Sequence, residues 1–439
     1  MSTFQNTIKN KKFIRMKPLL YSIALILVLA ACQQNSNTAI IADNDNAGIK
    51  VPDGFSALVF ADKLGPARHL DVNANGDVYV SLSDSKNGGG IACLRDANSD
   101  GRAEVIKYHG KFDGTGIKLH KGYVYFGADT IVVRYKLKQG ELVPEDNFEV
   151  IAKGFSNESQ HSSKPLTFDQ AGNMYVTVGA PSNACQQQDR TKGSPGMDPC
   201  PILELHGGIW RFKDDVANQD QAKDGYRFAT GIRNAVAINW NNAVDKLYAL
   251  QHGRDQLSQL YPELYSDEKS ANLPAEEFLL VDDGSDFGWP YCYYDDGQRK
   301  KVLAPEYGGD GMKTDRCEKA TDPIMAFPAH LAPNDVLFYT GSMFPEKYKN
   351  GAFIAFHGSW NRAPLPQEGY FVVFVPFKGT LPSGNWEVFA TGFAGVDVIK
   401  SPGDAKHRPC GLAQGPDGSL YVSDDVGGRI YRIIFTGKK

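Results

Sequence analysis

The sequence predicts an all-β protein, a six-bladed β-propeller of four-stranded antiparallel blades with a loop-rich insertion. First, 45 Gly and 24 Pro among 439 residues lie dispersed between Val, Ile, Tyr and Phe, which disfavours a helical bundle. Second, 42% of the residues are hydrophobic and only 22% are charged, so the chain can bury a large core. Third, one strand–turn–strand pattern recurs six times along the chain.

The first 31 residues form a separate leader. Five cations precede a short apolar run over residues 19–31, and small residues lead into Cys32. This pattern resembles a bacterial lipoprotein signal, in which Cys32 is lipidated and becomes the mature N-terminus. Initiation at Met1 or at Met16 fits equally, and an uncleaved anchor or a buried strand is the alternative interpretation.

These features predict three segments and a location. Residues 1–31 are assigned to a lipoprotein-type signal peptide, 32–49 to a flexible tether and 50–437 to the propeller. The protein is then exported and lipid-anchored in the bacterial envelope, facing the periplasm, with the outer membrane as the expected site. The lipid anchor would be its sole contact with the membrane.

The repeated unit is a short alternating strand, a turn rich in Asn, Asp and Gly, and a second strand. Clear copies lie at residues 70–80, 166–176, 236–248 and 412–422, and shorter copies at 119–125 and 348–356. Six units leave about 68 residues per blade after removal of the leader, enough for four short strands and their loops. A pair of β-sandwiches would not require the same hairpin six times.

The widest gap between copies predicts a loop-rich insertion over roughly residues 255–335. A second irregular segment, Asp96 to Glu104, resembles the start of a calcium loop, but Lys107 stands where an EF-hand needs Glu. We interpret that segment as a solvated turn, with weak calcium binding as the alternative.

Six cysteines follow the leader, and export makes disulfides permissible. Cys185 with Cys200, and Cys292 with Cys317, each enclose a short turn-rich loop, so these are the predicted pairs. Cys93 and Cys410 either pair or stay free. The spacings match neither a zinc site nor a haem attachment.

The overall charge argues against nucleic acid as a partner. The net charge is −4, and −9 once the five leader cations are removed. The sequence also contains no Gly-x-Gly-x-x-Gly after a strand, no Walker loop, no His-Glu-x-x-His and no Gly-x-Ser-x-Gly. A nicotinamide dehydrogenase, a kinase, a zincin and an α/β-hydrolase therefore lose support.

Positions just before and just after each hairpin should meet on one face of a propeller, near its axis. Arg and His occupy many of these positions although the mature chain is acidic: Arg68, His69, His161, Arg233, His252, Arg254, His357, Arg362, His407 and Arg408. Surface charges that merely balance the protein would not select equivalent positions of different blades. A ligand with several carboxylates would explain the convergence.

Five stretches carry a family resemblance. They are His161-Ser-Ser-Lys-Pro-Leu-Thr-Phe, Gly231-Ile-Arg-Asn234, Phe287-Gly-Trp-Pro290, His357-Gly-Ser-Trp-Asn-Arg362 and Arg408-Pro-Cys-Gly-Leu-Ala. In this order they resemble the soluble pyrroloquinoline-quinone (PQQ)-dependent sugar dehydrogenases, within them the sorbosone and pyranose dehydrogenase-like branch. The resemblance spans about residues 50–436.

The resemblance implies an oxidoreductase whose axial pocket binds PQQ with Ca²⁺. It implies oxidation of the C1 hydroxyl of an aldose or pyranose, or of a sugar aldehyde such as sorbosone, by hydride transfer to the quinone. His161 would be the general base, and Gly253 and Arg254 would offer main-chain carbonyls to calcium. The implied cofactor-binding residues are Arg68, Arg233, Asn234, His357, Trp360, Asn361, Arg362 and Arg408. Electrons would pass to a separate acceptor, a cytochrome or a quinone.

Three positions depart from the glucose-oxidising members. Arg254 replaces a proline, Gln160 replaces an aspartate before the base, and Cys410 replaces a second arginine. These changes bear on glucose specificity more than on the cofactor. Two alternatives stay open: a calcium-dependent propeller lactonase, suggested by Asp255, Asp424 and Asp425, and a non-catalytic propeller lipoprotein that binds glycans or proteins.

Overall fold

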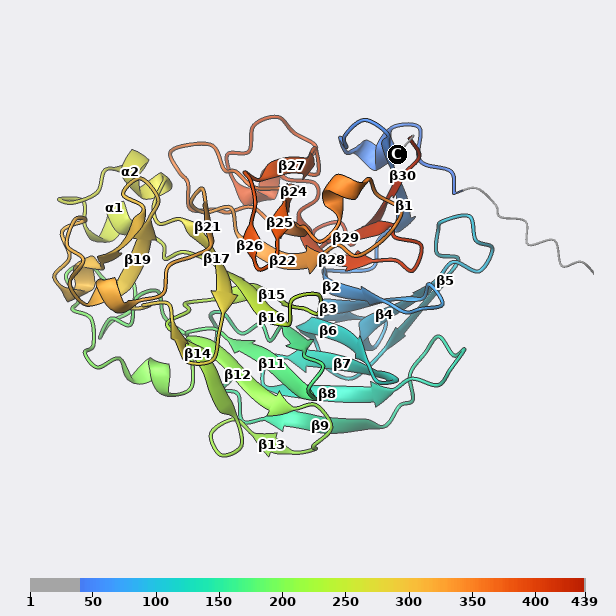
Figure 1. The fold of residues 1–439 in the computed structure, drawn as a ribbon, viewed down its shortest axis with the longest axis horizontal. Coiled ribbons are helices and arrows are strands. Elements are labelled where there is room, and N and C mark those ends of the chain that lie inside the picture. Colours follow the sequence, from blue (N-terminus) through green and yellow to red (C-terminus); the bar gives the residue numbers. More distant parts are fainter. Residues whose placement is uncertain (1–39, 438–439) are drawn as a thin grey trace, which may run out of the picture. The chain divides into compact units, whose positions relative to one another are not determined.

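The computed structural model describes residues 40–437, in which six blade sheets follow one another around a central axis and two small two-stranded sheets lie outside the blades (Figure 1). The colours in Figure 1 run around the centre in chain order, from blue through green and yellow to red. The leader, the lipidation prediction at Cys32 and most of the predicted tether lie outside the described residues. The predicted all-β, six-bladed propeller is confirmed.

The first three blades are built from consecutive antiparallel strands. Blade one contains β2 (Ala67–Val72), β3 (Val78–Lys86), β4 (Gly89–Arg95) and β5 (Val105–His109). Blade two contains β6 (Gly114–His120), β7 (Tyr123–Ala128), β8 (Ile131–Lys136) and β9 (Phe148–Lys153). Blade three contains β10 (Leu166–Phe168), β11 (Asn173–Val178), β12 (Gly208–Lys213) and β14 (Tyr226–Thr230). Short parallel strands extend the last two sheets, β13 (Gln219–Asp220) beside β9 and β18 (Ser285–Asp286) beside β14.

The remaining blades complete the ring. Blade four contains β15 (Ala235–Asn241), β16 (Lys246–Gln251), β17 (Glu276–Val281) and β21 (Met325–Phe327). Blade five contains β22 (Pro333–Phe338), β23 (Ala352–Phe356), β24 (Phe371–Val375) and β27 (Glu387–Ala390). Blade six combines β28 (Pro409–Gln414), β29 (Leu420–Asp424) and β30 (Ile430–Phe435) with β1 (Phe55–Ala61) from the start of the domain. This pairing of β1 with β30 joins the two ends of the described chain and closes the ring.

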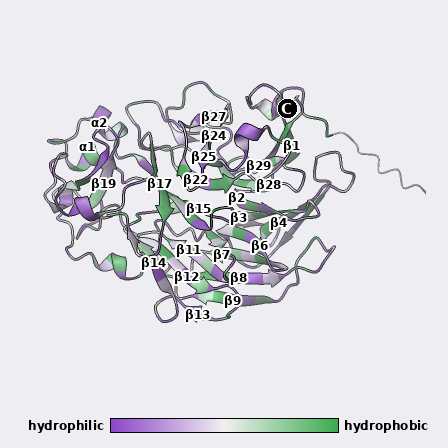
Figure 2. Ribbon diagram, viewed as in Figure 1, coloured by the Kyte–Doolittle hydropathy of each residue, from purple (hydrophilic) through white to green (hydrophobic). Residues whose placement is uncertain are grey.

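Hydrophobic residues concentrate on the blade strands because each sheet packs between two neighbouring sheets (Figure 2). Strand β23, with the sequence Ala-Phe-Ile-Ala-Phe, is buried at every position. A separate hydrophobic cluster fills each of the six interfaces between adjacent blades. The innermost strands β2, β6, β10, β15, β22 and β28 surround the axis.

Five of the six predicted hairpins coincide with an inner strand and its partner, and the sixth was placed wrongly. Tyr348 ends a short 3-10 helix and residues 349–350 form a turn, so the predicted copy at 348–356 contains only one strand, β23. Its true partner is β22, which lies beyond a connection of 13 residues, 339–351. The predicted tether also ends early, because the carboxylate of Asp43 accepts the backbone N–H of Val59 in β1 at 2.8 Å.

The predicted insertion at 255–335 is in fact two excursions from blade four. Residues 252–275 carry α1 (Leu257–Leu260) and α2 (Asp267–Ala271), and residues 282–324 carry the hairpin of β19 (Cys292–Asp295) and β20 (Lys300–Leu303). Strands β17 and β21 run between and after them as regular blade strands. A small hairpin of β25 (Phe377–Lys378) and β26 (Leu381–Pro382) decorates blade five.

Both predicted disulfides are present, Cys185–Cys200 and Cys292–Cys317. Cys93 and Cys410 are buried and unpaired, which resolves the alternative left open for them. Within residues 40–437, none of the helices has the length and apolar character needed to cross a membrane.

Candidate active site

A cavity of about 420 Å³ opens at the end of the axis where the inner strands begin. The inner strands and the segments just before them contribute Arg68, Ser163, Asn234, Asn334 and Arg408, and the segments after their hairpin partners contribute His252, Gly253 and His357. The sequence argument expected these equivalent positions to meet, and the structure brings them together. Other residues of the lining are His161, Ser162, Arg233, Asp255, Glu276, His330, Ser359 and Trp360.

His161 lies on the loop before β10 and presents one ring nitrogen to the cavity. Its Nδ1 lies 2.5 Å from the carbonyl oxygen of Ala180, so Nδ1 carries the proton and Nε2 is left as a proton acceptor. Burial, and then the charge of Arg233, lower the pKa of His161 from 6.5 to about 3. The ring is therefore neutral at physiological pH, the protonation state of a general base.

The loop that carries His161 is held in an unusual backbone conformation. His161 has φ of +55°, in the left-handed region that non-glycine residues rarely adopt. A Cβ on Gly179 would stand 2.6 Å from the Cβ of His161 and 3.0 Å from Oδ1 of Asn234. Glycine at position 179 is thus what allows the base and Asn234 to approach each other.

Arg233 forms the centre of one side of the cavity. Its Nη2 donates to Oδ2 of Asp255 at 2.7 Å, and its Nη1 donates to the carbonyl oxygen of Gly253 at 3.0 Å. Although burial alone would raise the pKa of Asp255, Arg233 and Arg190 outweigh it and lower that pKa to about 2. The Nε of Arg233 is buried without a hydrogen-bond partner. This orphaned donor at the cavity wall can serve an acceptor on a ligand.

A second cationic group lies on the side of the cavity formed by blades one, five and six. Nη1 of Arg68 donates to Asp425 at 2.6 Å, and Nε2 of His357 lies 2.8 Å from both oxygens of the same carboxylate. Burial opposes ionisation, but His357 and Arg68 hold the pKa of Asp425 well below its usual range. The guanidinium of Arg408 donates to the main-chain carbonyls of His357 and Gly358 and forms no ion pair with an acid among the described residues.

Several residues of the lining were not predicted as site residues, and Glu276 and His330 are the titratable groups among them with no assigned role. Glu276 begins β17 and accepts the backbone N–H groups of Gly253 and Ala332, and burial raises its pKa to about 8. His330 also lines the cavity, and its Nε2 lies 3.0 Å from the carbonyl oxygen of Ser270. The pair Glu276-Glu277 at the start of an apolar strand was the available signal, because acids are rarely buried without a function or a partner. His252, whose pKa burial lowers to about 4, was considered but not assigned.

Three predicted site residues point away from the cavity. Asn361 lies outside the cavity lining and donates to Oδ1 of Asp255 at 3.1 Å. Arg362 is buried and donates to the carbonyl oxygens of Ala271 and Ala329. Since neither lines the cavity, the geometry does not support direct contact with a cofactor. The Arg254 side chain turns into the insertion and pairs with Glu306 at 2.5 Å. Only its main chain is then free for a metal, as its predicted role requires.

The cavity fits an anionic, planar cofactor better than it fits a bare metal. Its wall combines three guanidinium groups, the Asn234 and Asn334 amides and three serine residues, all of which carry hydrogen-bond donors. A calcium ion could use the Gly253 carbonyl, whose second lone pair is not taken by Arg233. The acids that suggested a lactonase are engaged: Asp255 and Asp425 with arginines, and Asp424 with His407 at 2.7 Å.

The turn at Asp96 lies elsewhere in the fold. Asp96, Asp100 and Glu104 place their oxygens within 4.8 Å of one another, and within residues 40–437 they form the single acidic or His/Cys cluster with this spacing. The carboxylates of Asp96 and Glu104 accept backbone N–H groups of the same turn. These contacts agree with the interpretation as a solvated turn.

Comparison with known proteins places the fold in context. The chain matches the TrAA12-like family over residues 49–435. An uncharacterized protein of Borreliella burgdorferi is 24% identical over 91% of this chain and 94% of its own length. The PQQ-dependent pyranose dehydrogenase of Coprinopsis cinerea is 29% identical over 55% of this chain, an alignment that spans only 36% of that protein.

Two solved structures share the architecture. The holo PQQ domain of the Coprinopsis cinerea pyranose dehydrogenase superposes with a TM-score of 0.69 at 20% identity, covering 88% of this chain and 97% of the domain. A calcium structure of a Trichoderma reesei carbohydrate-active enzyme of family AA12 gives a TM-score of 0.71 at 18% identity, covering 88% of this chain and 97% of that chain.

Proposed function

The chain belongs to the TrAA12-like family, and we propose from that premise that it is a PQQ-dependent sugar dehydrogenase. Its substrate would be an aldose or pyranose oxidised at the C1 hydroxyl, or a sugar aldehyde such as sorbosone. The observation that carries the proposal is the axial cavity, in which a neutral histidine stands beside three arginines. Relatives whose names state PQQ and sugar dehydrogenation support the same assignment.

In this proposal His161 removes the proton from the sugar hydroxyl. Its Nδ1–H is fixed by the Ala180 carbonyl, so Nε2 is the atom that receives the proton. Burial, and then the charge of Arg233, lower the pKa of His161 and keep the ring neutral before the reaction. The bound quinone would supply the hydride acceptor, a chemistry that side chains do not provide.

The cofactor would be held by Arg68, Arg233, Asn234 and Arg408, with His357 and Trp360 at the rim. Arg233 offers its unpaired Nε, and the guanidinium of Arg408 forms no ion pair with an acid among the described residues. Both can therefore stabilise the negative charge of cofactor carboxylates or of the reduced ring. Trp360 is 54% exposed at the mouth, where a sugar or the cofactor can cover its ring. Calcium would bind at the carbonyls of Gly253 and Arg254.

The proposal also includes the cellular location of the protein and its electron acceptor. We place it as a lipoprotein anchored through Cys32 in the bacterial envelope and facing the periplasm, where a separate cytochrome or quinone would collect the electrons. The net negative charge of the chain gives no support to nucleic acid as a partner.

Reconstitution tests the proposed function. The protein is incubated with PQQ and Ca²⁺ and assayed by dye reduction over a panel of aldoses, pyranoses and sugar aldehydes, with lactone hydrolysis measured in parallel. We expect sugar-dependent dye reduction that requires PQQ and is lost in His161→Ala. Lactone hydrolysis without PQQ would overturn the proposal. So would the absence of sugar-dependent dye reduction in the wild type, or the same rate of dye reduction in His161→Ala as in the wild type.

A further inference from the structure

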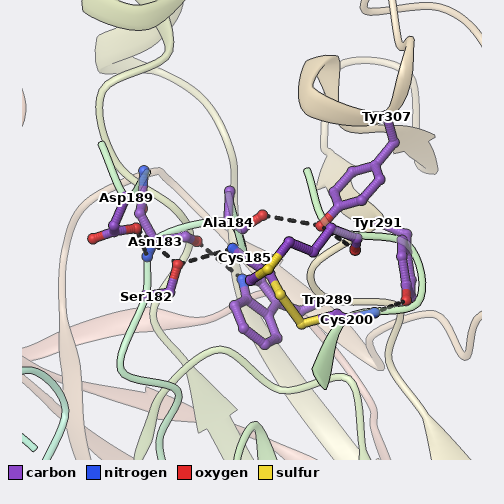
Figure 3. The surroundings of a disulfide bond; sticks show 10 residues. Ser182, Asn183, Ala184, Cys185, Asp189, Cys200, Trp289, Tyr291 and Tyr307 are labelled. Atoms are coloured by element: carbon purple, nitrogen blue, oxygen red, sulfur yellow. Dashed lines mark hydrogen bonds between the residues drawn. A yellow bond between two sulfur atoms is a disulfide. The ribbon is translucent and has the colours of Figure 1, made fainter. Parts of the chain in front are cut away.

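The connection between β11 and β12, residues 179–207, packs against the cavity from outside and contains the Cys185–Cys200 disulfide (Figure 3). It supplies no blade strand, and within it Asn183 is completely buried. Its contacts reach two parts of the site, the arginine pair and the loop of the general base. The connection therefore supports the site although it supplies no side chain to the lining.

Asn183 satisfies all of its polar groups. Its Oδ1 accepts the backbone N–H of Asp255 at 2.9 Å, and its Nδ2 donates to the Asp255 carbonyl oxygen at 2.9 Å. Its own N–H donates to Asp189 at 2.9 Å, and its carbonyl oxygen accepts Nε1–H of Trp289 at 3.0 Å. The side-chain amide of Asn183 thus hydrogen-bonds both the N–H and the C=O of Asp255, as a neighbouring strand would.

Asp255 is the residue whose carboxylate orients Arg233 in the cavity wall. Because its main chain is fixed by Asn183, its carboxylate can meet Arg233 at 2.7 Å and Arg190 of the same connection at 3.0 Å. An aspartate in place of Asn183 has no N–H to donate, so the Asp255 carbonyl would face a like-charged oxygen instead.

The connection also holds the segment of the general base. Gln160, which precedes His161, donates to Asp189 at 3.2 Å, and Ser182 donates to the same carboxylate at 2.7 Å. The Ser182 hydroxyl oxygen in turn accepts the backbone N–H of Cys185 at 2.9 Å. One short chain of hydrogen bonds therefore leads from the disulfide to the residue beside the base.

The disulfide joins two points of this connection, and hydrogen bonds beside each cysteine join it to the insertion. The backbone N–H of Cys200 donates to the Tyr291 hydroxyl at 2.9 Å, and the Tyr307 hydroxyl donates to the Ala184 carbonyl at 3.1 Å (Figure 3). Cys185, Cys200 and Trp289 pack together in one small hydrophobic cluster. Without the covalent link, residues 185–200 would be free to separate and Asn183 would lose a support on its C-terminal side.

We propose that Asn183 is a positioning residue for the Asp255–Arg233 pair, and that the Cys185–Cys200 disulfide maintains it, so that cofactor affinity depends on an oxidised disulfide. The inference rests on the proposed function, because PQQ is the ligand that Arg233 would hold. It adds a redox dependence to a site that contains no cysteine in its lining.

A double-mutant cycle tests the first half. PQQ binding is measured by spectroscopic titration at fixed Ca²⁺ for the wild type, Asn183→Asp, Asp255→Asn and the double variant. We expect Asn183→Asp to weaken binding about tenfold or more, as for loss of a buried hydrogen bond next to a charge. In the Asp255→Asn background the same change should cost little, because the two residues act through one another. Additive effects would show a merely structural role and overturn the assignment.

Matched variants control for general destabilisation. Asn272→Asp also removes a side-chain donor to a backbone carbonyl, that of Glu268, but at the exposed residue that follows helix α2. It should leave PQQ affinity unchanged, and thermal unfolding is recorded for each variant to show that it is folded. Equal weakening in Asn183→Asp and Asn272→Asp would contradict the positioning role.

Selective removal of each disulfide tests the second half. The double variant Cys185→Ser, Cys200→Ser should weaken PQQ binding, because the loop that this disulfide encloses contains Arg190, which bonds Asp255. The double variant Cys292→Ser, Cys317→Ser should change PQQ binding much less, because no residue in the loop between these cysteines hydrogen-bonds Asp255. Equal effects would overturn the redox dependence. If the wild type fails to bind PQQ, the proposed function fails; if the wild type binds and the Asn183 and Cys185 variants bind as tightly, only this inference fails.

Discussion

His161 combines two features that are costly separately, burial and a left-handed backbone. Burial and Arg233 lower its pKa, so the ring stays neutral where an exposed histidine would be half protonated near pH 6.5. Strained backbone of this kind persists where the surroundings fix it, here the Ala180 carbonyl and the space left at Gly179. The residue is thus held ready to accept a proton.

The state of His161 can be measured directly. In the cofactor-free protein, we expect its ring ¹H–¹³C resonance to show no titration between pH 5 and 8, because its pKa lies near 3. Comparison with His161→Ala assigns the signal. A midpoint near 6.5 would contradict the burial of the ring.

Catalysis gives a second residue-scale prediction. His161→Ala should reduce kcat by about 10²–10⁴-fold, the usual contribution of a general base, with PQQ affinity little changed. His206, whose Nε2 lies 2.5 Å from the Ser156 hydroxyl outside the cavity, provides the control as His206→Ala. A loss of turnover in both variants would indicate a structural effect instead.

Asp425 predicts a pH dependence of stability. Its folded-state pKa is lowered by His357 and Arg68, so its contribution is present above the unfolded value of 3.8 and is lost as the pH falls below it. The free energy of unfolding of the wild type should therefore approach that of Asp425→Asn below about pH 4. A difference that stays constant from pH 7 to pH 3 in denaturant titrations would contradict this account.

At the scale of elements, two buried ion pairs hold the excursions of blade four, one joining an excursion to the propeller and the other joining the two excursions to each other. Lys301 in β20 pairs with Glu277 in β17 at 2.6 Å, and Arg254 pairs with Glu306. Both members of the first pair are almost fully buried, and Lys301 also donates to the Phe287 carbonyl. The two pairs fix Arg254 and Glu277, the chain neighbours of the cavity residues Gly253 and Glu276.

Breaking the Lys301–Glu277 pair should lower the stability of the fold strongly. Lys301→Met leaves the Glu277 carboxylate buried without its cation and should lower the free energy of unfolding by about 3–5 kcal/mol. The matched surface pair, Lys246 with Asp282, lies at 2.7 Å on the same strand ladder, and Lys246→Met should cost less than about 1 kcal/mol. Urea denaturation compares the two, and equal losses would show that burial does not matter here.

The sequence predicted elements well where local chemistry determines them. Hairpins with Asn, Asp and Gly turns, such as the one between β28 and β29, were placed correctly because those residues accept positive φ. Strand β22 was missed because the turn at Asn350 closes a 13-residue connection instead of directly joining β22 to β23. The roles given to Asn361 and Arg362 failed to match the geometry for a related reason, since side-chain direction in an irregular loop depends on tertiary packing.

At the scale of the whole domain, ring closure depends on β1. This strand leaves the start of the domain and pairs with β30 in the last blade, so the first and last segments share one sheet. Spacing of the hairpins predicted six blades, but it contained no signal for which strand completes the sixth. Pairing between distant ends is a property of closure and not of local sequence.

Truncation tests this closure. Removal of residues 1–61 takes away β1 and exposes the edge of β30 with the core around Phe55, so we expect loss of cooperative unfolding and of PQQ binding. Removal of residues 1–39 retains every strand of the six blades and should preserve both. Circular dichroism melting distinguishes the outcomes, and a folded 62–439 protein would contradict the role of β1.

The distribution of charge also becomes intelligible at this scale. The domain is acidic on average, yet Arg68, Arg233 and Arg408 from three different blades converge on one cavity. The repeated hairpin alone predicted that equivalent positions of different blades, and so these arginines, meet at the axis. The acids that accompany them, Asp255 and Asp425, could be recognised as partners only once the loops were placed.

The central claim is that this cavity binds an anionic quinone, and an equilibrium titration of the purified protein with PQQ at fixed Ca²⁺ tests it most directly. We predict saturable binding of one PQQ per chain, weakened at least about tenfold in Arg408→Met, which removes a cation without stranding an acid. Arg227→Met, which removes an exposed arginine bound to the Leu203 carbonyl, should bind PQQ like the wild type. The absence of saturable binding, or equal affinity in the Arg408→Met variant, would contradict the account.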